Sequence, residues 1–248
     1  FAFDVTQKSP GLWQTLIGPK ASPKPVVAGE LLNNMPITIR PSVTFNPLDN
    51  SIHLIVGTGE DITRNGTSGI NSLIGFKVTD QAIDSLNSLQ EYKLVTAGSD
   101  GLQIQAQPNP ALPPLGQARG WYMRLEGVAN AMKVTTKPQF NFGELLWTLD
   151  AETSNPAASC AATSTFSYLL AMNPISGGSL NKMLFRPKEG DKELQLDGIA
   201  LETHLTSWSL IRAGDKEYLT GGSDADGAVS LEKGASQRLE GRQSWRRL

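Results

Sequence analysis

The sequence predicts an all-β fold built mainly from antiparallel strands. Apolar and polar residues alternate in many short segments, which is the pattern of strands with one buried face. The 248 residues include 24 glycines and 15 prolines, about one residue in six, so turns are frequent and long helices are disfavoured. Strand–turn–strand units of this kind occur in sandwiches, barrels and propellers alike, and alternation does not choose among them.

The expected strands follow one another along the chain, and almost every one ends in turn residues. Gly57-Thr58-Gly59 and Gly221–Asp224 are examples, because glycine reaches the positive φ that tight connections need. The proline-rich stretches Pro19–Pro25 and Pro108–Pro114 are expected to be extended surface connections. The alternation predicts strands at Ile37–Val43, Ser51–Val56, Leu73–Val78, Gly120–Leu125, Phe142–Leu149, Phe166–Met172, His204–Ile211, Glu217–Thr220 and Ala228–Leu231.

One segment departs from this alternation. Between Asp80 and Glu91, apolar residues recur at every third position, at Ile83, Leu86 and Leu89, after a polar start. This spacing favours a short capped helix. A polar loop with three apolar contacts would have the same pattern, so both interpretations stay open.

Charge and composition exclude several classes of function. The chain has 22 basic and 24 acidic residues and a net charge of −2, which argues against a broad surface for nucleic acid or anionic lipid. No stretch approaches the roughly 18 consecutive apolar residues of a membrane span. The single cysteine, Cys160, excludes an internal disulfide framework and a cysteine-rich zinc site.

Catalytic candidates are few. The two histidines, His53 and His204, lie in strand-like segments with no Gly-x-Ser-x-Gly elbow nearby, so we expect them to be structural. Cys160 lies in a loop of small residues, where a role in packing, exposure or pairing with another chain stays open. Gly57-Thr58-Gly59 lacks the spacing of phosphate-binding loops and is better explained as a strand-ending turn.

Asp224 and Asp226 are the weak candidates for metal binding. They lie two residues apart in a glycine loop, where Ca²⁺ recruits carboxylate and carbonyl oxygens, although only Glu232 follows and a plain hairpin turn has the same sequence. The tryptophans are spread over strand-like segments and are expected to pack in the core rather than form a sugar-stacking platform. They are Trp13, Trp121, Trp147, Trp208 and Trp245.

A series of motifs occurs in order and covers most of the chain. They are PITIRPSVTF at Pro36–Phe45, IVGTGE at Ile55–Glu60, GWYMRLE at Gly120–Glu126, LLWTLD at Leu145–Asp150, YLLAMNPISGG at Tyr168–Gly178, YLTGGSD at Tyr218–Asp224 and GRQSWRRL at Gly241–Leu248. The series resembles the PITTRPAV…FGTG, GWYLDL, LYALDxxTGG and GRxSWREL motifs of the C-terminal β-propeller domain of the PilC/PilY family. Members of this family are large tip proteins of bacterial type IV pili.

The resemblance implies a degenerate β-propeller of antiparallel sheets over residues 1–248, or the C-terminal part of one. It implies a non-enzymatic protein that acts in adhesion, pilus assembly and retraction control, and therefore in twitching motility. The expected partners are minor pilins and a host cell or abiotic surface, and the expected location is exported, at the bacterial cell surface, the pilus tip and the outer membrane. Trp121, Tyr122 and Trp245 are its structural signature, with Trp245 as an anchor for the end of the chain.

Calcium is implied for the parent protein only. Phe1–Val5 resembles the end of a family strand that follows an Asp-x-Asp calcium loop, so the ligands would precede residue 1 and no cofactor is expected in this chain. Gly127–Met132 departs from the Gly-Glu-Arg that the family commonly has there. Contact residues are expected on the loops Asp61–Asn71, Pro108–Gln117 and Ser154–Thr163. Two other functions stay open, a propeller-scaffold quinoprotein dehydrogenase and a carbohydrate-binding surface module.

Overall fold

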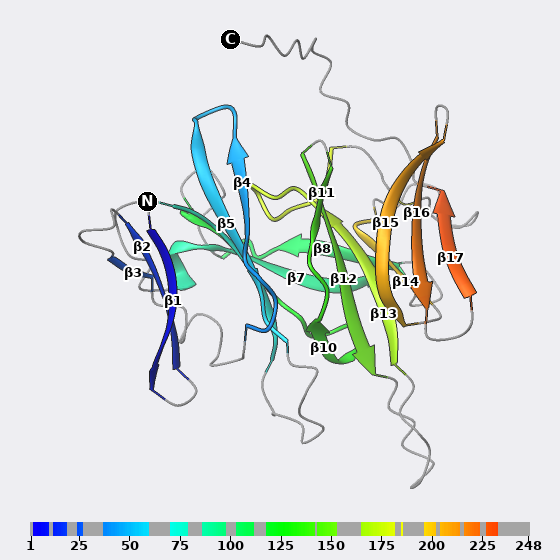
Figure 1. The fold of residues 1–248 in the computed structure, drawn as a ribbon, viewed down its shortest axis with the longest axis horizontal. Coiled ribbons are helices and arrows are strands. Elements are labelled where there is room, and N and C mark those ends of the chain that lie inside the picture. Colours follow the sequence, from blue (N-terminus) through cyan, green and yellow to red (C-terminus); the bar gives the residue numbers. More distant parts are fainter. Residues whose placement is uncertain are drawn as a thin grey trace, which may run out of the picture.

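A computed structural model gives the fold of the chain (Figure 1). It describes residues 2–9, 12–18, 24–26, 37–59, 70–78, 86–97, 103–111, 118–141, 143–152, 165–181, 185, 196–201, 204–213, 216–223 and 227–232. These residues form strands in three sheets, together with one short 3₁₀ turn, η1 (Leu86–Ser88).

The described residues form seventeen strands. They are β1 (Ala2–Ser9), β2 (Leu12–Gly18), β3 (Lys24–Val26), β4 (Ser42–Asn46), β5 (Ser51–Gly57), β6 (Ser72–Lys77), β7 (Gln90–Ala97), β8 (Gln103–Pro108), β9 (Gly120–Arg124), β10 (Asn130–Val134), β11 (Gln139–Asn141), β12 (Glu144–Glu152), β13 (Thr165–Met172), β14 (Gly198–Leu201), β15 (Leu205–Ala213), β16 (Lys216–Ser223) and β17 (Gly227–Glu232).

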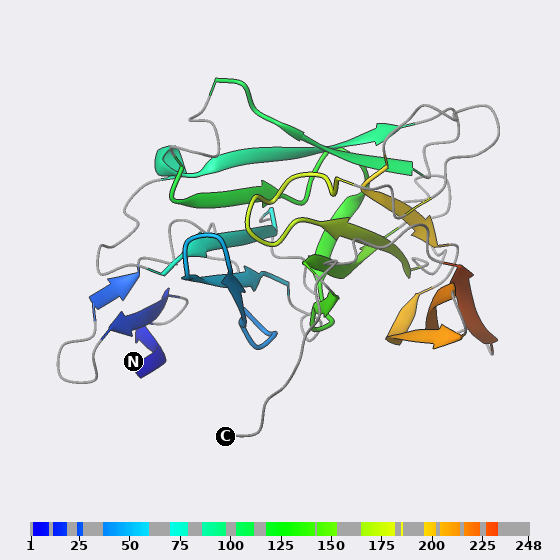
Figure 2. The ribbon, with the colours of Figure 1, turned by 90° about the horizontal axis from the view of Figure 1, so that it is seen from above.

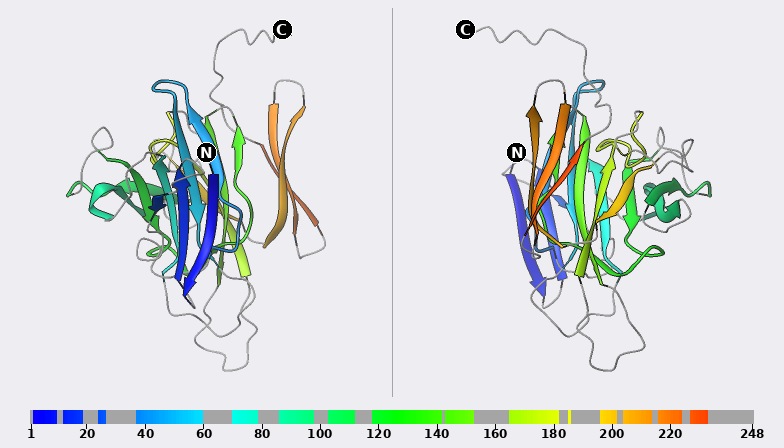
Figure 3. Two further views of the ribbon diagram at one scale, coloured as in Figure 1. Left: turned by 60° about the vertical axis from the view of Figure 1, so that its left-hand side comes forward. Right: turned by 90° about the vertical axis from the view of Figure 1, so that its right-hand side faces the viewer.

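The main sheet has the strand order β10-β12-β13-β14-β8-β7-β9-β6-β5-β4, with β11 paired to β12. It curls strongly, so that β7 and β8 lie across the curl from β5 and β12 when seen from above (Figure 2). The sheets β1-β2-β3 and β15-β16-β17 flank it on two sides (Figures 1 and 3). The all-β, propeller-like fold class expected from the sequence is therefore confirmed.

Hydrogen bonds join β10, at one end of the curled sheet, to residues that flank β5 and β6, near the other end. The Val134 N–H on β10 donates to the carbonyl of Thr58, directly after β5, at 3.1 Å. The Asn71 side-chain amide donates to the carbonyl of Met132 at 2.8 Å. Gly59 lies against the backbone of Val134, where a Cβ atom would collide with it. The turn expected at Gly57-Thr58-Gly59 is wrong, because Gly57 ends β5, Thr58 continues its hydrogen bonding to Ser72, and Gly59 forms a bridge with Ile37. This extended segment is the place where the curl closes.

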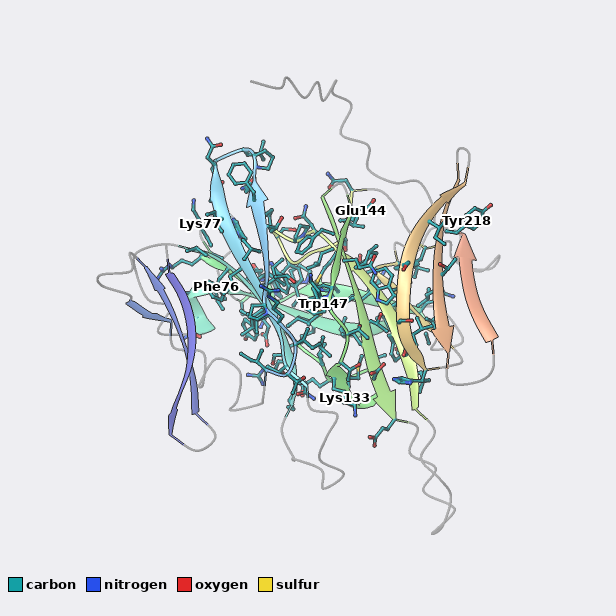
Figure 4. The ribbon with its side chains drawn as sticks, viewed as in Figure 1. Phe76, Lys77, Lys133, Glu144, Trp147 and Tyr218 are labelled. Carbon is teal, nitrogen blue, oxygen red and sulfur yellow. The ribbon has the colours of Figure 1, made fainter. Side chains whose placement is uncertain are left out.

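The largest core cluster includes residues from β5, β6, β9, β10, β12 and β13, so it fills the inside of the curl. Trp121 and Trp147 are its largest side chains and are 0% and 1% exposed. Trp147 lies near the middle of the molecule (Figure 4). A second cluster, around Leu54 and Phe76, covers the opposite face of β5, β6 and β9. A third joins β12–β14 to β15 and includes Trp208.

Trp121 is held by a turn from a distant part of the chain. Its indole N–H donates to the carbonyl of Pro174 at 3.0 Å. Its ring lies directly against Gly75 of β6 and Gly177, at both of which any Cβ atom would overlap the indole. Gly177 also has a positive φ of 72°, which glycine adopts without steric cost. The GWYMRLE and YLLAMNPISGG motifs of the sequence therefore pack against each other at Trp121.

Most predicted strands agree with the structure apart from their ends. Ile37–Val43 is predicted too early, because β4 starts at Ser42, after Pro41, and Ile37 forms only an isolated bridge with Gly59. Proline has no N–H for a ladder, so it confines β4 to the residues that follow it. One pairing, between β7 and β9, is parallel and departs from the antiparallel expectation.

The short capped helix, one of the two interpretations of Asp80–Glu91, is not formed in the described part of this segment. Only Leu86–Ser88 is helical, as a single 3₁₀ turn, and Gln90 already begins β7. Apolar residues at every third position suit the three residues per turn of a 3₁₀ helix. After Leu89, alternation resumes, since Tyr92 and Leu94 are buried while Lys93 is exposed. Residues 79–85 lie outside the described residues.

The proline-rich stretches have mixed outcomes. Lys24–Val26, at the end of Pro19–Pro25, forms β3 and pairs with β2, with Pro25 opposite Leu16. Because β3 is the edge of its sheet, the missing N–H of proline is tolerated there. Pro108 ends β8, the turn at Asn109–Ala111 follows, and residues 112–117 lie outside the described residues.

We predict that Gly177→Ala destabilises the protein far more than Gly143→Ala. Both glycines have positive φ, of 72° and 86°, so both variants carry the same backbone strain of about 1–2 kcal/mol. Only at Gly177 does the new methyl group meet the Trp121 ring, whereas nothing lies within 4 Å at Gly143. Overpacking adds about 1–3 kcal/mol, measurable by urea denaturation. Equal losses for the two variants would contradict the packing of Trp121.

Candidate functional site

One buried carboxylate with several side-chain partners is Asp150, on β12, which is 1% exposed. Ser167 on the neighbouring strand β13 donates its hydroxyl to this carboxylate at 2.8 Å, and Thr135 donates to the other oxygen. The His204 imidazole lies 3.3 Å from the same oxygen. Ser167 also accepts the Leu205 N–H at 3.0 Å. This network ties the start of β15 to the main sheet.

The arrangement at Asp150 resembles a catalytic triad in composition but not in order. In a triad, the histidine lies between the serine and the acid, so that it takes the serine proton. Here Ser167 gives its proton to the carboxylate instead. The geometry therefore supports a clamp between two sheets, and it agrees with the structural role expected for His204.

A second polar cluster lies at the β4–β5 hairpin. The Ser51 hydroxyl donates to Asp49 at 2.6 Å and lies 2.9 Å from His53 Nε2. Since the only hydroxyl proton goes to Asp49, the imidazole donates from Nε2 to Ser51, and its buried Nδ1 has no partner among the described residues. Lys77 closes the cluster with an ion pair to Asp49 at 2.8 Å.

Burial lowers the pKa of His53, and the charge of Lys77 acts in the same direction, while Asp49 opposes them. Hydrogen bonds from Lys77 and Ser51 hold the pKa of Asp49 well below its usual range. His53 is therefore a neutral, buried side chain at physiological pH, as expected of a structural histidine.

The signature residue Tyr122 belongs to a third cluster. Its hydroxyl is hydrogen-bonded to Glu91 on β7, and burial together with this bond raises the pKa of Tyr122 to about 12. Glu91 is buried, accepts a hydrogen bond from Asn109, and lies 4.0 Å from Arg124 Nε. The cluster joins β7 to β9 across their parallel pairing, so Tyr122, like Trp121, is a structural residue.

Asp197 is a buried acid that the sequence did not single out. It accepts the Ala106 N–H at 2.7 Å and the Ser179 hydroxyl at 3.0 Å. Burial raises the pKa of Asp197, and these two hydrogen bonds partly offset the shift. It holds the turn after β13 against β8, next to the strand pairing of β8 with β14.

Several predicted site residues lie outside the described residues. They are Cys160, Asp224, Asp226 and Trp245, together with most of the expected contact loops. Asn71, at the end of one loop, is buried and helps to close the curl. In the described ranges, the tryptophan side chains 121, 147 and 208 are buried and form no exposed sugar platform.

The described side chains include no group of three or more His, Cys, Asp or Glu residues placed to hold a metal ion. Calcium binding, whether at Asp224 and Asp226 or upstream in the parent protein, stays a prediction. Across the same ranges, no helix has the length and hydropathy that crossing a membrane requires.

Comparison with known proteins identifies the fold. No family model and no curated protein matches the chain. A crystal structure of the PilY1 C-terminal domain from Pseudomonas aeruginosa superposes on 88% of this chain with a TM-score of 0.60, at 15% sequence identity. The chain shares its fold with part of the PilY1 C-terminal domain. It spans about half the length of that solved chain, 47%. The resemblance to the PilC/PilY propeller domain is thus confirmed at the level of fold.

We predict that the stability of the protein falls as the pH drops below 6.5, in part through His53. The unfolded chain takes up a proton near pH 6.5, while the folded chain does so only at lower pH. The unfolded state therefore binds more protons in this window, and stability present above pH 6.5 is lost as the pH falls through the folded pKa. Urea denaturation of the wild type and His53→Gln across this range measures the effect, and parallel pH curves would contradict it.

We predict that Asp150→Ala lowers the free energy of unfolding by about 2–4 kcal/mol, because it leaves buried hydroxyl groups without their acceptor. Glu126→Ala is the matched control, since Glu126 is an exposed acid in the turn after β9, and a change of less than about 0.5 kcal/mol is expected. Equilibrium urea denaturation compares the two. Similar small losses for both would show that the clamp is unimportant.

Proposed function

We propose that this protein is a non-enzymatic component of the type IV pilus tip that acts in bacterial adhesion and in the control of pilus assembly and retraction. The observation that carries this proposal is the fold match to the PilY1 C-terminal domain over 88% of the chain. The ordered motif series of the sequence adds support, because Gly120–Glu126 and Tyr168–Gly178 pack together around Trp121. Minor pilins and a host or abiotic surface are the proposed partners, at an exported, surface location.

The described polar clusters are consistent with a protein that presents surfaces. Asp150 and Glu91 each form hydrogen bonds to side chains of neighbouring strands or turns, and both are buried, as is His53. A core that is fixed in this way tolerates variation in its loops without loss of the fold. Loops that vary on a rigid scaffold suit a protein that must contact other molecules.

We predict that in-frame deletion of the gene abolishes or strongly reduces surface piliation, twitching and attachment in the source bacterium. Electron microscopy of surface pili, twitching-zone diameter and a static adhesion assay measure the three effects. Complementation with the intact gene is the control and restores all three. Unchanged piliation and attachment in the deletion strain would overturn the proposal.

A turnover assay separates the proposed function from the dehydrogenase alternative. The purified chain is incubated with a pyrroloquinoline quinone, alcohol and sugar substrates, and an artificial electron acceptor dye. The proposal expects no dye reduction above that of a heat-denatured sample. Sustained, protein-dependent reduction would support a quinoprotein and contradict the non-enzymatic role.

A further inference from the structure

Exposed apolar side chains gather on the hairpin formed by β4 and β5. Val43, Phe45 and Ile52 are 61%, 54% and 43% exposed, and Leu48 in the turn is 93% exposed. We call these four residues the apolar strip. Elsewhere in the described ranges, the large hydrophobic residues with this degree of exposure are Phe140 and Ile211. Contiguous apolar surface of this kind marks an interaction site more often than scattered residues do.

The hairpin has its polar and apolar faces reversed relative to an ordinary surface strand. Phe45 lies opposite Ile52 in the ladder, so their side chains share the exposed face. The alternate residues Ser42, Ser51 and His53 are buried instead. A surface strand normally turns its apolar residues inward. The hairpin therefore presents to solvent the face that a strand usually covers.

The apolar strip continues a buried core cluster. Val43 lies opposite Leu54, which is 2% exposed and packs with Phe76 and Ile74. Leu54 and the strip residues of β4 and β5 therefore lie on the same face of the sheet. This face is covered by the core cluster at Leu54 and exposed to solvent at the apolar strip. A partner that covered the strip would extend this packing without any rearrangement of the core.

The free edge of β4 has backbone groups that point away from the sheet. Among the described strands, β4 is the last in the order of the main sheet and pairs on one side only, with β5. The Val78 N–H donates to the Ile52 carbonyl at 2.8 Å, so the backbone groups of Ile52 face β6. In an antiparallel ladder, the residue opposite then turns its own N–H and C=O outward. Phe45, and by alternation Val43, therefore direct a donor and an acceptor each to the open edge.

This edge lacks the usual protection against strand addition. Natural edges are blunted by charged residues, prolines within the strand or bulges. The segment Ser42–Asn46 contains no charged residue or proline, and its register with β5 is unbroken. Pro41 and Pro47 lie just outside it and limit the exposed ladder to these five residues, about 16 Å of strand.

The charges around the hairpin define the chemistry of a partner. Lys77 and Asp49 neutralise each other in an ion pair at 2.8 Å. The apolar strip itself carries no charge. A strand with charged side chains on this face would have to bury them without a partner, which is costly. The complementary strand is therefore uncharged, with apolar residues at alternate positions.

We propose that β4 is an acceptor edge for a short, uncharged, extended segment of a partner protein, which adds to the main sheet by backbone pairing with Val43 and Phe45. Its alternate apolar side chains pack on the apolar strip. This mode of recognition gains affinity from main-chain hydrogen bonds and specificity from alternate side chains. The proposal does not rest on the pilus role, since it follows from the edge and the strip alone.

The test uses the full 248-residue chain and a fluorescein-labelled synthetic peptide of alternating threonine and valine. Fluorescence anisotropy measures binding, and a peptide with proline at alternate positions is the control ligand. The proposal expects saturable binding of the first peptide only. Hydrogen exchange followed by NMR is expected to show slower exchange of the Val43 and Phe45 amides when the peptide is bound.

Two variants locate the site. Phe45→Lys is expected to weaken peptide binding at least about tenfold, whereas Phe140→Lys, which introduces the same charge at another exposed phenylalanine, leaves it unchanged. Val43→Pro removes an outward N–H without removing a hydrogen bond to β5, so it weakens binding while the melting temperature stays close to that of the wild type.

Several outcomes would overturn the proposal. They are no binding of the alternating peptide, equal binding by the Phe45→Lys and Phe140→Lys variants, or equal binding of the proline-containing peptide. A second copy of the chain could also pair with the edge of β4, and sedimentation velocity tests for such a dimer. Dimers of the wild type that Phe45→Lys dissociates would assign the edge to self-association and reject the partner segment.

Discussion

The packing of Trp121 is the interaction on which the rest of the structure most depends. Its ring fits between two positions that only glycine can occupy, Gly75 on β6 and Gly177 in the turn after β13. Its indole N–H, which would otherwise be buried without an acceptor, is satisfied by Pro174. One side chain thus fixes the distance between two regions of the curled sheet that are far apart in sequence, and the surrounding apolar residues pack around it.

The buried polar clusters hold further strands and turns of the structure together. Asp150 attaches β15 to the main sheet, Glu91 joins β7 to β9, and Asp197 holds a turn against β8. Each is a buried acid whose cost of burial is offset by hydrogen bonds to neighbouring elements. The apolar core therefore defines the curl of the main sheet. The buried acids fix which strands and turns lie against one another around it. The β4–β5 hairpin is the exception, because there the apolar face is open.

Much of this fold can be read from the sequence, and particular residues explain why the rest cannot. Short, largely apolar segments bounded by turn residues located β5, β6, β9 and β13, although β5, β6 and β9 are buried on both faces rather than alternating. Alternation missed β8, where Gln103 is buried beside Ile104. The three-residue spacing of Leu86 and Leu89 favoured a short helix where a single 3₁₀ turn forms, and a polar loop was the other interpretation. Asp150 looks like an ordinary strand residue until Ser167 and His204 are brought to it by pairings that local sequence does not encode. The reversed faces of β4 are visible in SVTFN only once its register with β5 is known.

The hydrogen bond between Val134 and Thr58 has a kinetic consequence. It links two segments separated by most of the strands of the main sheet, so we expect it to form after those strands have been ordered. Contacts of such long sequence separation slow the search for the native topology. Because this closure comes late, its loss would chiefly accelerate unfolding and leave the rate of folding nearly unaltered. The contact that closes the curl is thus expected to act mainly on the unfolding rate, and so on the lifetime of the folded state.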